Sequence, residues 1–257
     1  MKKPGNNKEA VLSRDFQIRS YEVGPGNKIA VLTYLNFLQD AAGDQAEKLG
    51  VSFPSLLKKN RTWILSRYNL EIYRYPAWKE RITVTTWPSG KERAFFLREF
   101  EVFSTDGNPL LRASSAWIMF DLSRRRPVRP GGFMESFPID PRRATPGDFS
   151  PIGFPDDQPP LKKTFTVRAD EVDLNNHLNH PYYIVFALEN VPEEERSDEG
   201  VLWIRASFRH PAFRGERISV LTVREERETG PVFFHRVARE ADGKELARVE
   251  TGWKDPC

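Results

Sequence analysis

The chain has 257 residues, of which 39% are hydrophobic and 29% charged, enough apolar material for one large domain or two small ones. Its net charge of +3 does not predict nucleic-acid binding, which needs clustered basic residues. The single cysteine, Cys257, supports neither a disulfide framework nor a buried catalytic thiol. Since no apolar run approaches the ~20 residues of a membrane span, we expect a soluble cytoplasmic protein that binds neither nucleic acid nor membrane.

The first half of the chain predicts one helix followed by a series of strands. Apolar residues recur at helical spacing at Leu35, Leu38, Ala42, Ala46 and Leu49. Gly50 is a natural stop for this helix. Strand-like runs follow at 62–73, 81–88, 94–104 and 109–121. The turn residues Asp106-Gly107-Asn108 predict that the last two strands form a hairpin.

Residues 122–160 differ in composition and predict a connector. Nine of the 20 prolines lie between 127 and 160, and hydrophobic periodicity is weak. The connector also carries several arginines: Arg124, Arg125, Arg126, Arg129, Arg142 and Arg143. Such a group is either a solvated surface run or a docking face for an acidic partner.

The second half repeats the plan of the first. Pro181 suits the first turn of a helix that carries Ile184, Leu188 and Val191 and stops at Pro192. Strands are expected near 201–209, 216–225, 231–240 and 245–254. The Asp242-Gly243 turn joins the last two as a hairpin.

The two halves also share sequence. Residues 76–84 read Pro-Ala-Trp-Lys-Glu-Arg-Ile-Thr-Val, and residues 211–220 read the same pattern with Gly215 as an apparent insertion. Asp106-Gly107 precedes Trp117 at the spacing at which Asp242-Gly243 precedes Trp253. The shared order indicates two copies of one unit with pseudo-two-fold symmetry. We therefore predict an α+β fold in which residues 76–122 and 211–254 superpose.

Polar side chains are concentrated at residues 173–180, Asp-Leu-Asn-Asn-His-Leu-Asn-His, directly before the second helix. In an extended segment, Asp173, Asn175 and His177 share one side because side chains alternate. A carboxylate, an amide and an imidazole could then activate water against a carbonyl. The structural alternative is a turn whose Asn and Asp residues cap the next helix.

Other candidates are weaker. Asp173, His177 and His180 are too few for a metal site, so neither a metal nor a cofactor is expected. His235 lies in a strand-like run and is expected at the surface or in the core. The tryptophans of the first half are expected in the core, with a subset able to line an apolar tunnel: Trp63, Trp78, Trp87 and Trp117. The chain lacks the Gly-x-Ser-x-Gly motif of many serine hydrolases.

Over residues 15 to 255 the sequence resembles the acyl-[acyl-carrier-protein] thioesterases of plants and bacteria. The resemblance runs through residues 74–78 (Arg-Tyr-Pro-Ala-Trp), 112–119 (Arg-Ala-Ser-Ser-Ala-Trp-Ile-Met), Arg124-Arg125-Arg126 and the Asp-x-Asn-x-His motif at 173–177, with Tyr183 and Leu188-Glu189 behind it. It implies two tandem hot-dog domains, each a long helix wrapped by an antiparallel β-sheet. We expect a substrate-shaping domain at 1–135, a linker at 136–160 and a catalytic domain at 161–257.

The resemblance also implies the reaction and its residues. Asp173, Asn175 and His177 map onto the catalytic group, and the substrate would be a fatty acyl thioester on acyl carrier protein, hydrolysed by a monomer or homodimer. Many members carry a Glu, sometimes beside a Cys, on the strand after the second helix. Here that stretch reads Phe208-Arg209-His210-Pro211-Ala212, with His210 as a speculative substitute. Pro211 aligns with Pro76 in the repeat, which favours a structural turn.

The residues suggest a mechanism in which His177 is the base, because imidazole is the side chain that titrates nearest neutral pH. Asp173 would hold the imidazole or bind the water, and Asn175 would donate to the developing oxyanion. Two alternatives stay open. One is a hydratase or dehydratase acting on an acyl thioester, and the other is a non-catalytic protein that binds acyl carrier protein.

Overall fold

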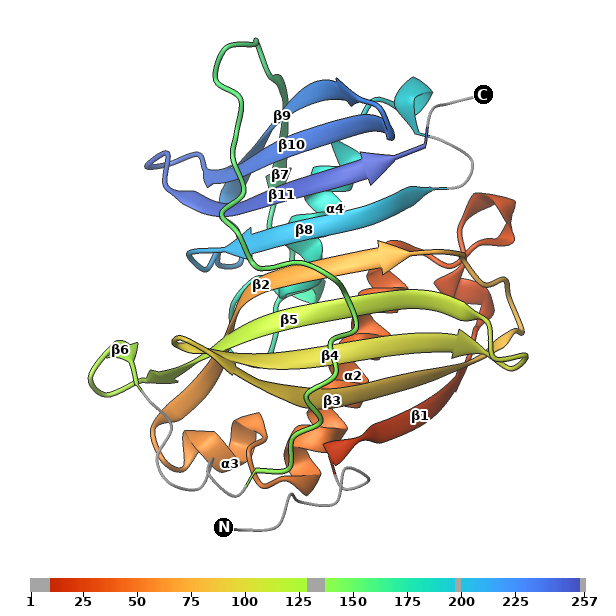
Figure 1. Ribbon diagram of the computed structural model, residues 1–257. Coiled ribbons are helices and arrows are strands. Elements are labelled where there is room, and N and C mark those ends of the chain that lie inside the picture. The colour runs from red at the N-terminus through yellow and green to blue at the C-terminus, as the bar shows by residue number, and fades with distance from the viewer. Residues whose placement is uncertain (1–9, 129–136, 197–199, 255–257) are drawn as a thin grey trace. The chain divides into compact units, whose positions relative to one another are not determined.

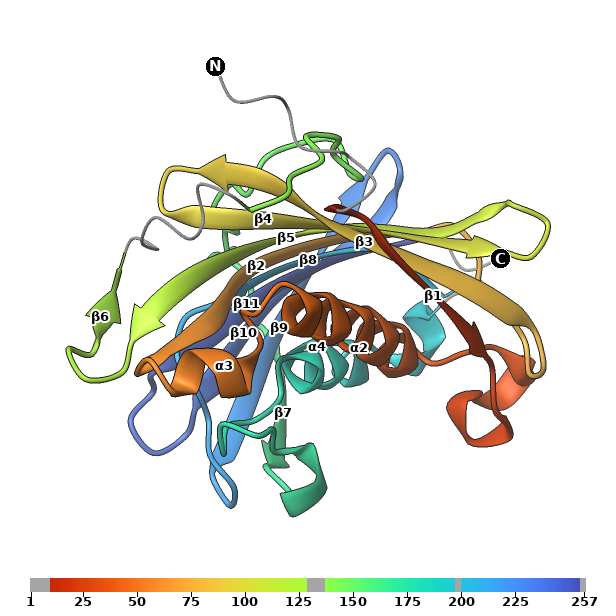
Figure 2. The same cartoon turned by 90° about the horizontal axis from the view of Figure 1, so that it is seen from below.

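The computed structural model describes residues 10–128, 137–196 and 200–254. The chain divides into two compact units. Unit 1 takes the described part of Met1–Ser66 and Tyr73–Gly147, and unit 2 that of Arg67–Ile72 and Asp148–Cys257. Within each unit an antiparallel sheet packs against one principal helix (Figures 1 and 2). The predicted α+β class is confirmed.

The sheet of unit 1 has the strand order β1-β3-β4-β5. Its strands are β1 (Leu12–Gln17), β3 (Arg81–Glu92), β4 (Phe95–Ser104) and β5 (Pro109–Asp121), with the short β6 (Arg126–Pro127) paired to β5 and the start of β2 (Arg61–Ile72) within the unit. The predicted hairpin at Asp106-Gly107-Asn108 is confirmed, since β4 and β5 pair directly across it. Gly107 has a φ of 78°, which glycine adopts at little cost.

Helix α2 (Val31–Lys48) packs against β1 and β3. Leu35 and Leu38 are fully buried as predicted, but further along the buried positions are Ala41 and Gln45. Ala42, Ala46 and Leu49, which recur at the same helical spacing, are only partly buried. Gln45 is tolerated inside because its Nε2 donates to the carbonyls of Ala10 and Thr86, at 2.6 and 3.2 Å. The short helix α3 (Phe53–Leu57) follows, with Pro54 in its first turn.

The sheet of unit 2 has the strand order β8-β11-β10-β9-β7. Its strands are β7 (Leu161–Thr166), β8 (Val201–Phe208), β9 (Arg217–Arg227), β10 (Gly230–Arg239) and β11 (Glu245–Trp253). The part of β2 that belongs to this unit pairs with β8, with Tyr68 opposite Ala206. The four strands expected in this half are confirmed to within two residues at each end.

Helix α4 (His180–Glu189) packs against β9, β10 and β11. It has 10 residues against the 18 of α2 and ends before Val191. Asn190, the residue directly after the helix, is buried and donates from Nδ2 to the Val220 carbonyl and to Thr222 Oγ1, at 3.1 and 2.7 Å. An amide at the helix end therefore ties the helix to the sheet in each unit.

The edge strands β1 and β7 occupy matching places. Phe16 of β1 stacks on Phe37 of α2 with ring centroids 4.4 Å apart, and Phe165 of β7 stacks on Phe186 of α4 at 4.5 Å. Four single-turn 3₁₀ helices complete the described structure: Ser20–Glu22, Pro25–Asn27, Ala169–Glu171 and Glu193–Glu195. In the described residues no helix is both long and apolar enough to cross a membrane.

Candidate functional site

The Asp173–His177 segment forms a tight loop rather than an extended strand. A β-bridge between Val172 and Leu178 closes the loop. Inside it the Asp173 N–H donates to the His177 carbonyl at 2.8 Å, and the Asn176 N–H donates to the Asp173 carbonyl at 3.0 Å. Asn176 has a φ of 60°, a left-handed conformation that asparagine adopts more readily than most residues. The expectation that alternation places three side chains on one side was therefore wrong.

The carboxylate of Asp173 holds the backbone of this loop. Its Oδ1 accepts the N–H of Asn175 at 2.8 Å and the N–H of His177 at 3.2 Å. Both of these bonds come from backbone N–H groups, not from the imidazole ring of His177. Asp173 thus fixes the places of Asn175 and His177 through their backbones.

His177 lies where the loop meets the rest of unit 2. Its half-buried ring contacts Phe213 edge-to-face, with centroids 5.2 Å apart. The next residue, Leu178, donates its N–H to the Ala212 carbonyl at 2.8 Å. Asn175 is exposed, so its amide is open to a ligand. The loop therefore presents one amide and one imidazole from a backbone that is tied on both sides.

Helix α4 starts directly after the loop. Pro181 is in its first turn as predicted. The turn of Asn and Asp residues that the structural alternative predicted is present, but Asn179 at the N-cap position makes no side-chain capping bond, so only the capping part was wrong. The positive end of the helix dipole lies beside the loop, and it favours negative charge that develops there.

His180 differs from His177 in its surroundings. Its ring centroid lies 6.0 Å from that of Tyr68 and 5.9 Å from that of Phe208. Burial among these groups lowers the pKa of His180 to about 3, so the imidazole is neutral in the working range. His180 is therefore a weaker proton acceptor than an ordinary histidine. Among the described residues no group of three or more His, Cys, Asp or Glu side chains could hold a metal ion.

The stretch at which the sequence resemblance implies a glutamate, residues 209–212, follows β8. His210 is largely exposed. The partial burial of its ring and the positive charges of Lys244, Arg239 and Arg209 lower its pKa. No hydrogen bond joins its ring to Asp173, Asn175 or His177 among the described residues. The Pro211 carbonyl accepts from Arg239 Nη2 at 3.0 Å. The role of His210 as a substitute for the glutamate therefore stays a prediction.

Unit 1 contains a second loop with the same frame. Residues 23–29 are closed by a Val23–Ile29 bridge, as residues 172–178 are by Val172–Leu178. The Gly24 N–H donates to the Lys28 carbonyl at 2.9 Å, as the Asp173 N–H donates to the His177 carbonyl. The Asn27 N–H donates to the Gly24 carbonyl at 3.2 Å, as the Asn176 N–H donates to the Asp173 carbonyl. Asn27 is left-handed like Asn176, with a φ of 57°. In this loop Gly24, Gly26 and Lys28 stand where unit 2 has Asp173, Asn175 and His177.

The matched hydrogen bonds also correct the register of the repeat. In unit 1 the Ile29 N–H donates to the Pro76 carbonyl, and in unit 2 the Leu178 N–H donates to the Ala212 carbonyl. Likewise the Lys79 N–H donates to the Ile18 carbonyl, and the Gly215 N–H donates to the Val167 carbonyl. They match Pro76 with Ala212 and Lys79 with Gly215, so Gly215 is not an insertion. Lys79 and Gly215 share a left-handed φ, 71° and 81°. The predicted match of Pro211 to Pro76 was wrong by one residue.

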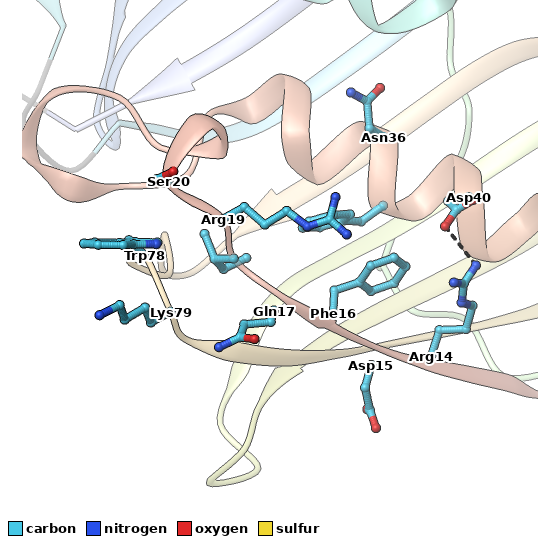
Figure 3. A pocket seen from close by; sticks show the side chains of 12 residues that line it. Arg14, Asp15, Phe16, Gln17, Arg19, Ser20, Asn36, Asp40, Trp78 and Lys79 are labelled. Carbon is cyan, nitrogen blue, oxygen red and sulfur yellow. Dashed lines mark hydrogen bonds and ion pairs between the residues drawn. The ribbon is translucent and has the colours of Figure 1, made fainter.

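A pocket of about 770 Å³ lies in unit 1 between β1 and α2 (Figure 3). Phe16 and Phe37 line it together with charged groups such as Arg14, Asp40 and Lys79. None of its lining residues belongs to the Asp173 loop, and its mixed polarity does not suit an acyl chain.

The tryptophans of unit 1 are not all in the core. Trp87 is 1% exposed, as predicted, whereas Trp78 is 47% exposed and lines the pocket. Trp63 and Trp117 are partly buried. In unit 2, His235 is buried in the core between Thr222 and Thr251, as expected.

The connector arginines fall into two groups. Arg142 pairs with Asp140 at 2.8 Å, and Arg143 pairs with the buried Glu99 at 2.9 Å. Both therefore serve the structure of unit 1. Arg124, Arg125 and Arg126 are exposed where β5 turns into β6, and Arg129 lies outside the described residues.

The two matched units and the single polar loop define a double hot-dog protein. Residues 9–130 match the N-terminal domain model of the acyl-ACP thioesterases, and residues 155–255 match the C-terminal domain model. The chain belongs to the acyl-ACP thioesterase family.

Several curated relatives are plant enzymes. The chain is 27% identical over 263 residues to a chloroplastic palmitoyl-acyl carrier protein thioesterase of Gossypium hirsutum, covering 95% of this chain and 64% of that protein. It is 26% identical over 281 residues to a chloroplastic oleoyl-acyl carrier protein thioesterase of Coriandrum sativum, covering 93% and 75%. The chain thus spans less than two thirds of the length of the palmitoyl-type relative.

Solved structures share the fold over nearly the whole chain. The 12:0-ACP thioesterase of Umbellularia californica has a TM-score of 0.84 at 25% identity, covering 95% of this chain and 94% of that one. An acyl-ACP thioesterase of Bacteroides thetaiotaomicron has a TM-score of 0.83 at 24% identity, covering 96% and 99%.

Proposed function

We propose that this protein hydrolyses the thioester of fatty acyl-[acyl-carrier-protein] and releases a free fatty acid in fatty acid biosynthesis. Family membership supports the proposal, as do the names of the relatives, which are thioesterases acting on acyl carrier protein. The observation that carries it is the contrast between two loops of one frame. Only the loop of unit 2 carries a carboxylate, an amide and an imidazole.

In the proposed reaction His177 takes a proton from water, whose oxygen attacks the thioester carbonyl carbon. The exposed amide of Asn175 donates to the oxyanion, and the start of α4 adds its dipole. Collapse of the intermediate breaks the C–S bond, and His177 returns the proton to the carrier's thiolate. Asp173 keeps both side chains in place through the Asn175 and His177 backbones. No group from the Pro211 position takes part.

The partner in this proposal is acyl carrier protein, an acidic protein. Within the described residues, the exposed Arg124, Arg125 and Arg126 are the part of the connector suited to meet it. We further propose domains at 1–135 and 161–257 with a 136–160 linker, a monomer or homodimer, and a cytoplasmic location. The plant relatives are chloroplastic by name, so fractionation of the source cell tests the location.

The experiment is incubation of the purified protein with a series of acyl-[acyl-carrier-protein] thioesters and identification of the products by mass spectrometry. Free fatty acid together with free carrier thiol supports the proposal. Enoyl or hydroxyacyl thioesters would instead identify a hydratase or dehydratase. Binding of the acyl carrier without turnover would identify a non-catalytic binding protein.

A further inference from the structure

Tyr183 of α4 is a buried phenol directly behind the Asp173–His177 loop. Its side chain is 4% exposed, and its ring lies edge-to-face against Phe208 with centroids 5.8 Å apart. The phenol oxygen accepts the N–H of Ala212 at 2.9 Å and lies 3.5 Å from the His210 carbonyl, to which it donates. The hydroxyl therefore joins α4 to the segment that follows β8.

That segment holds His177 from two directions. The Ala212 carbonyl accepts the N–H of Leu178, the residue after His177, at 2.8 Å. The ring of Phe213, the residue after Ala212, contacts the His177 ring at 5.2 Å. A shift of Ala212 would therefore move both the backbone and the ring contact of His177.

Unit 1 shows what the same arrangement looks like without the polar loop. Tyr34 stands on α2 as Tyr183 does on α4, and its hydroxyl donates to the Arg74 carbonyl at 2.6 Å. The residue matched to Ala212 is Pro76, whose carbonyl accepts the Ile29 N–H at 3.0 Å. Proline has no N–H, so Pro76 cannot make the bond that Ala212 makes to Tyr183. The bond from this backbone position to the phenol is thus confined to the unit that carries His177.

We propose that Tyr183 is a positioning residue for His177 and acts through the Ala212 N–H bond. This proposal rests on the hydrolysis proposed above. Tyr183 does not touch the reacting atoms. It fixes Ala212, and Ala212 with Phe213 fixes the imidazole against the thioester carbon. Small displacements of a catalytic group cost rate without weakening substrate binding.

The first test is Tyr183→Phe, which keeps the ring and removes the hydroxyl. We expect kcat for acyl-carrier hydrolysis to fall about tenfold with KM unchanged. The Ala212 amide should exchange with solvent faster, and the His177 ring resonances should move in NMR spectra. Tyr34→Phe is the matched control because it removes a buried phenol bond of unit 1. It should leave kcat, Ala212 exchange and the His177 resonances unchanged.

The second test transfers the unit 1 residue into unit 2. Ala212→Pro removes the N–H and keeps Tyr183, and it should lower kcat to the same extent as Tyr183→Phe. The double variant should lose little more, because both changes break one bond. Additive losses, or unchanged Ala212 exchange and His177 resonances in Tyr183→Phe, would overturn the proposal. If the wild-type protein releases no fatty acid, the proposed function fails, and the NMR measurements still decide whether Tyr183 positions His177.

Discussion

The loops at 23–29 and 172–178 share their backbone hydrogen bonds but carry different side chains. Each is closed by a β-bridge, each has a left-handed asparagine, and each follows a 3₁₀ turn whose glutamate accepts a backbone N–H three residues earlier. Yet one carries Gly24, Gly26 and Lys28, whereas the other carries an acid, an amide and an imidazole. The frame therefore belongs to the repeated fold, and the polar side chains are a separate feature of unit 2.

The comparison also bears on Asp173. In unit 1 the loop closes without a carboxylate at the matching place, helped by Gly26, which has a φ of 75°. Asn175 of unit 2 is not among the residues with positive φ. A glycine at this point would relax the loop but would supply no donor. The Asp173 carboxylate thus lets unit 2 combine a fixed loop with an exposed amide.

The largest expected effect is that of His177→Ala. Loss of a general base typically lowers turnover by about 10²–10⁴-fold. Lys28→Ala, the matched change in unit 1, should leave turnover near the wild-type rate. Release of fatty acid is measured together with circular dichroism to show that both variants fold. Full activity in folded His177→Ala would remove His177 from the mechanism.

Asn175→Ala should have the next largest effect. Removing one oxyanion donor typically costs about 10²–10³ in kcat. Folding should survive because Asn175 is exposed and its backbone N–H still reaches Asp173. Steady-state kinetics and a thermal melt check this pair of outcomes. A rise in KM at constant kcat would show instead that Asn175 binds the ground state.

Two changes at Asp173 separate its place in the loop from its charge. An asparagine oxygen can still accept the N–H groups of Asn175 and His177, whereas alanine cannot. We expect Asp173→Ala to be about tenfold slower than Asp173→Asn, because the loop loses both bonds. Comparison of kcat for the two variants measures this. Equal, severe losses would show that the negative charge itself takes part in the reaction.

The connector arginines should produce a smaller, substrate-dependent effect. Changing Arg124, Arg125 and Arg126 to Glu should lower kcat/KM for the carrier-linked substrate by about tenfold at low salt, since steering by exposed charge is screened by ions. A pantetheine thioester should be hydrolysed nearly as before. Rates for both substrates over a salt series make the test. Equal losses on both, or none on either, would leave these arginines as a solvated turn.

The sequence predicted the elements with strong local signals. Strands β2 to β5 and β8 to β11 have β-branched and aromatic residues between clear turns, and both Asp-Gly hairpins follow from turn geometry. The edge strands β1 and β7 were missed because they are short, with at most half of their side chains facing the interior. Helix α3 has only 5 residues, too few for a periodic signal.

The sequence singled out the residues of the candidate site, but it did not predict the geometry of their loop. Asp173, Asn175 and His177 are distinctive in the sequence, but alternation gave the wrong local shape because Asp173 bonds to backbone two and four residues on. The repeat was misaligned at Gly215, since Lys79 adopts a left-handed conformation that a sequence comparison does not expect of lysine. The loop in unit 1 escaped notice because it shares only one polar side chain with the loop of unit 2, Asn27 in the place of Asn176.

The last prediction concerns the stability of the fold against pH and not turnover. Burial lowers the pKa of His180 and of His235 from 6.5 to about 3 in the folded protein. Between those values only the unfolded chain binds protons at these side chains, so the folded state is favoured fully above pH 6.5 and loses stability as pH falls toward 3. Each histidine contributes a slope of at most about 1.4 kcal/mol per pH unit.

Urea unfolding at about pH 7, pH 6 and pH 5 measures this slope before most carboxylates titrate. His235→Asn removes one of the histidines whose pKa is lowered and should reduce the slope by at most about 1.4 kcal/mol per pH unit, because His180 and His210 still contribute. The change costs some stability at every pH, since His235 bonds to Thr222 and Thr251, but that loss is constant and leaves the slope readable. A slope that His235→Asn does not alter would show that His235 protonates in the folded protein as easily as in the unfolded chain.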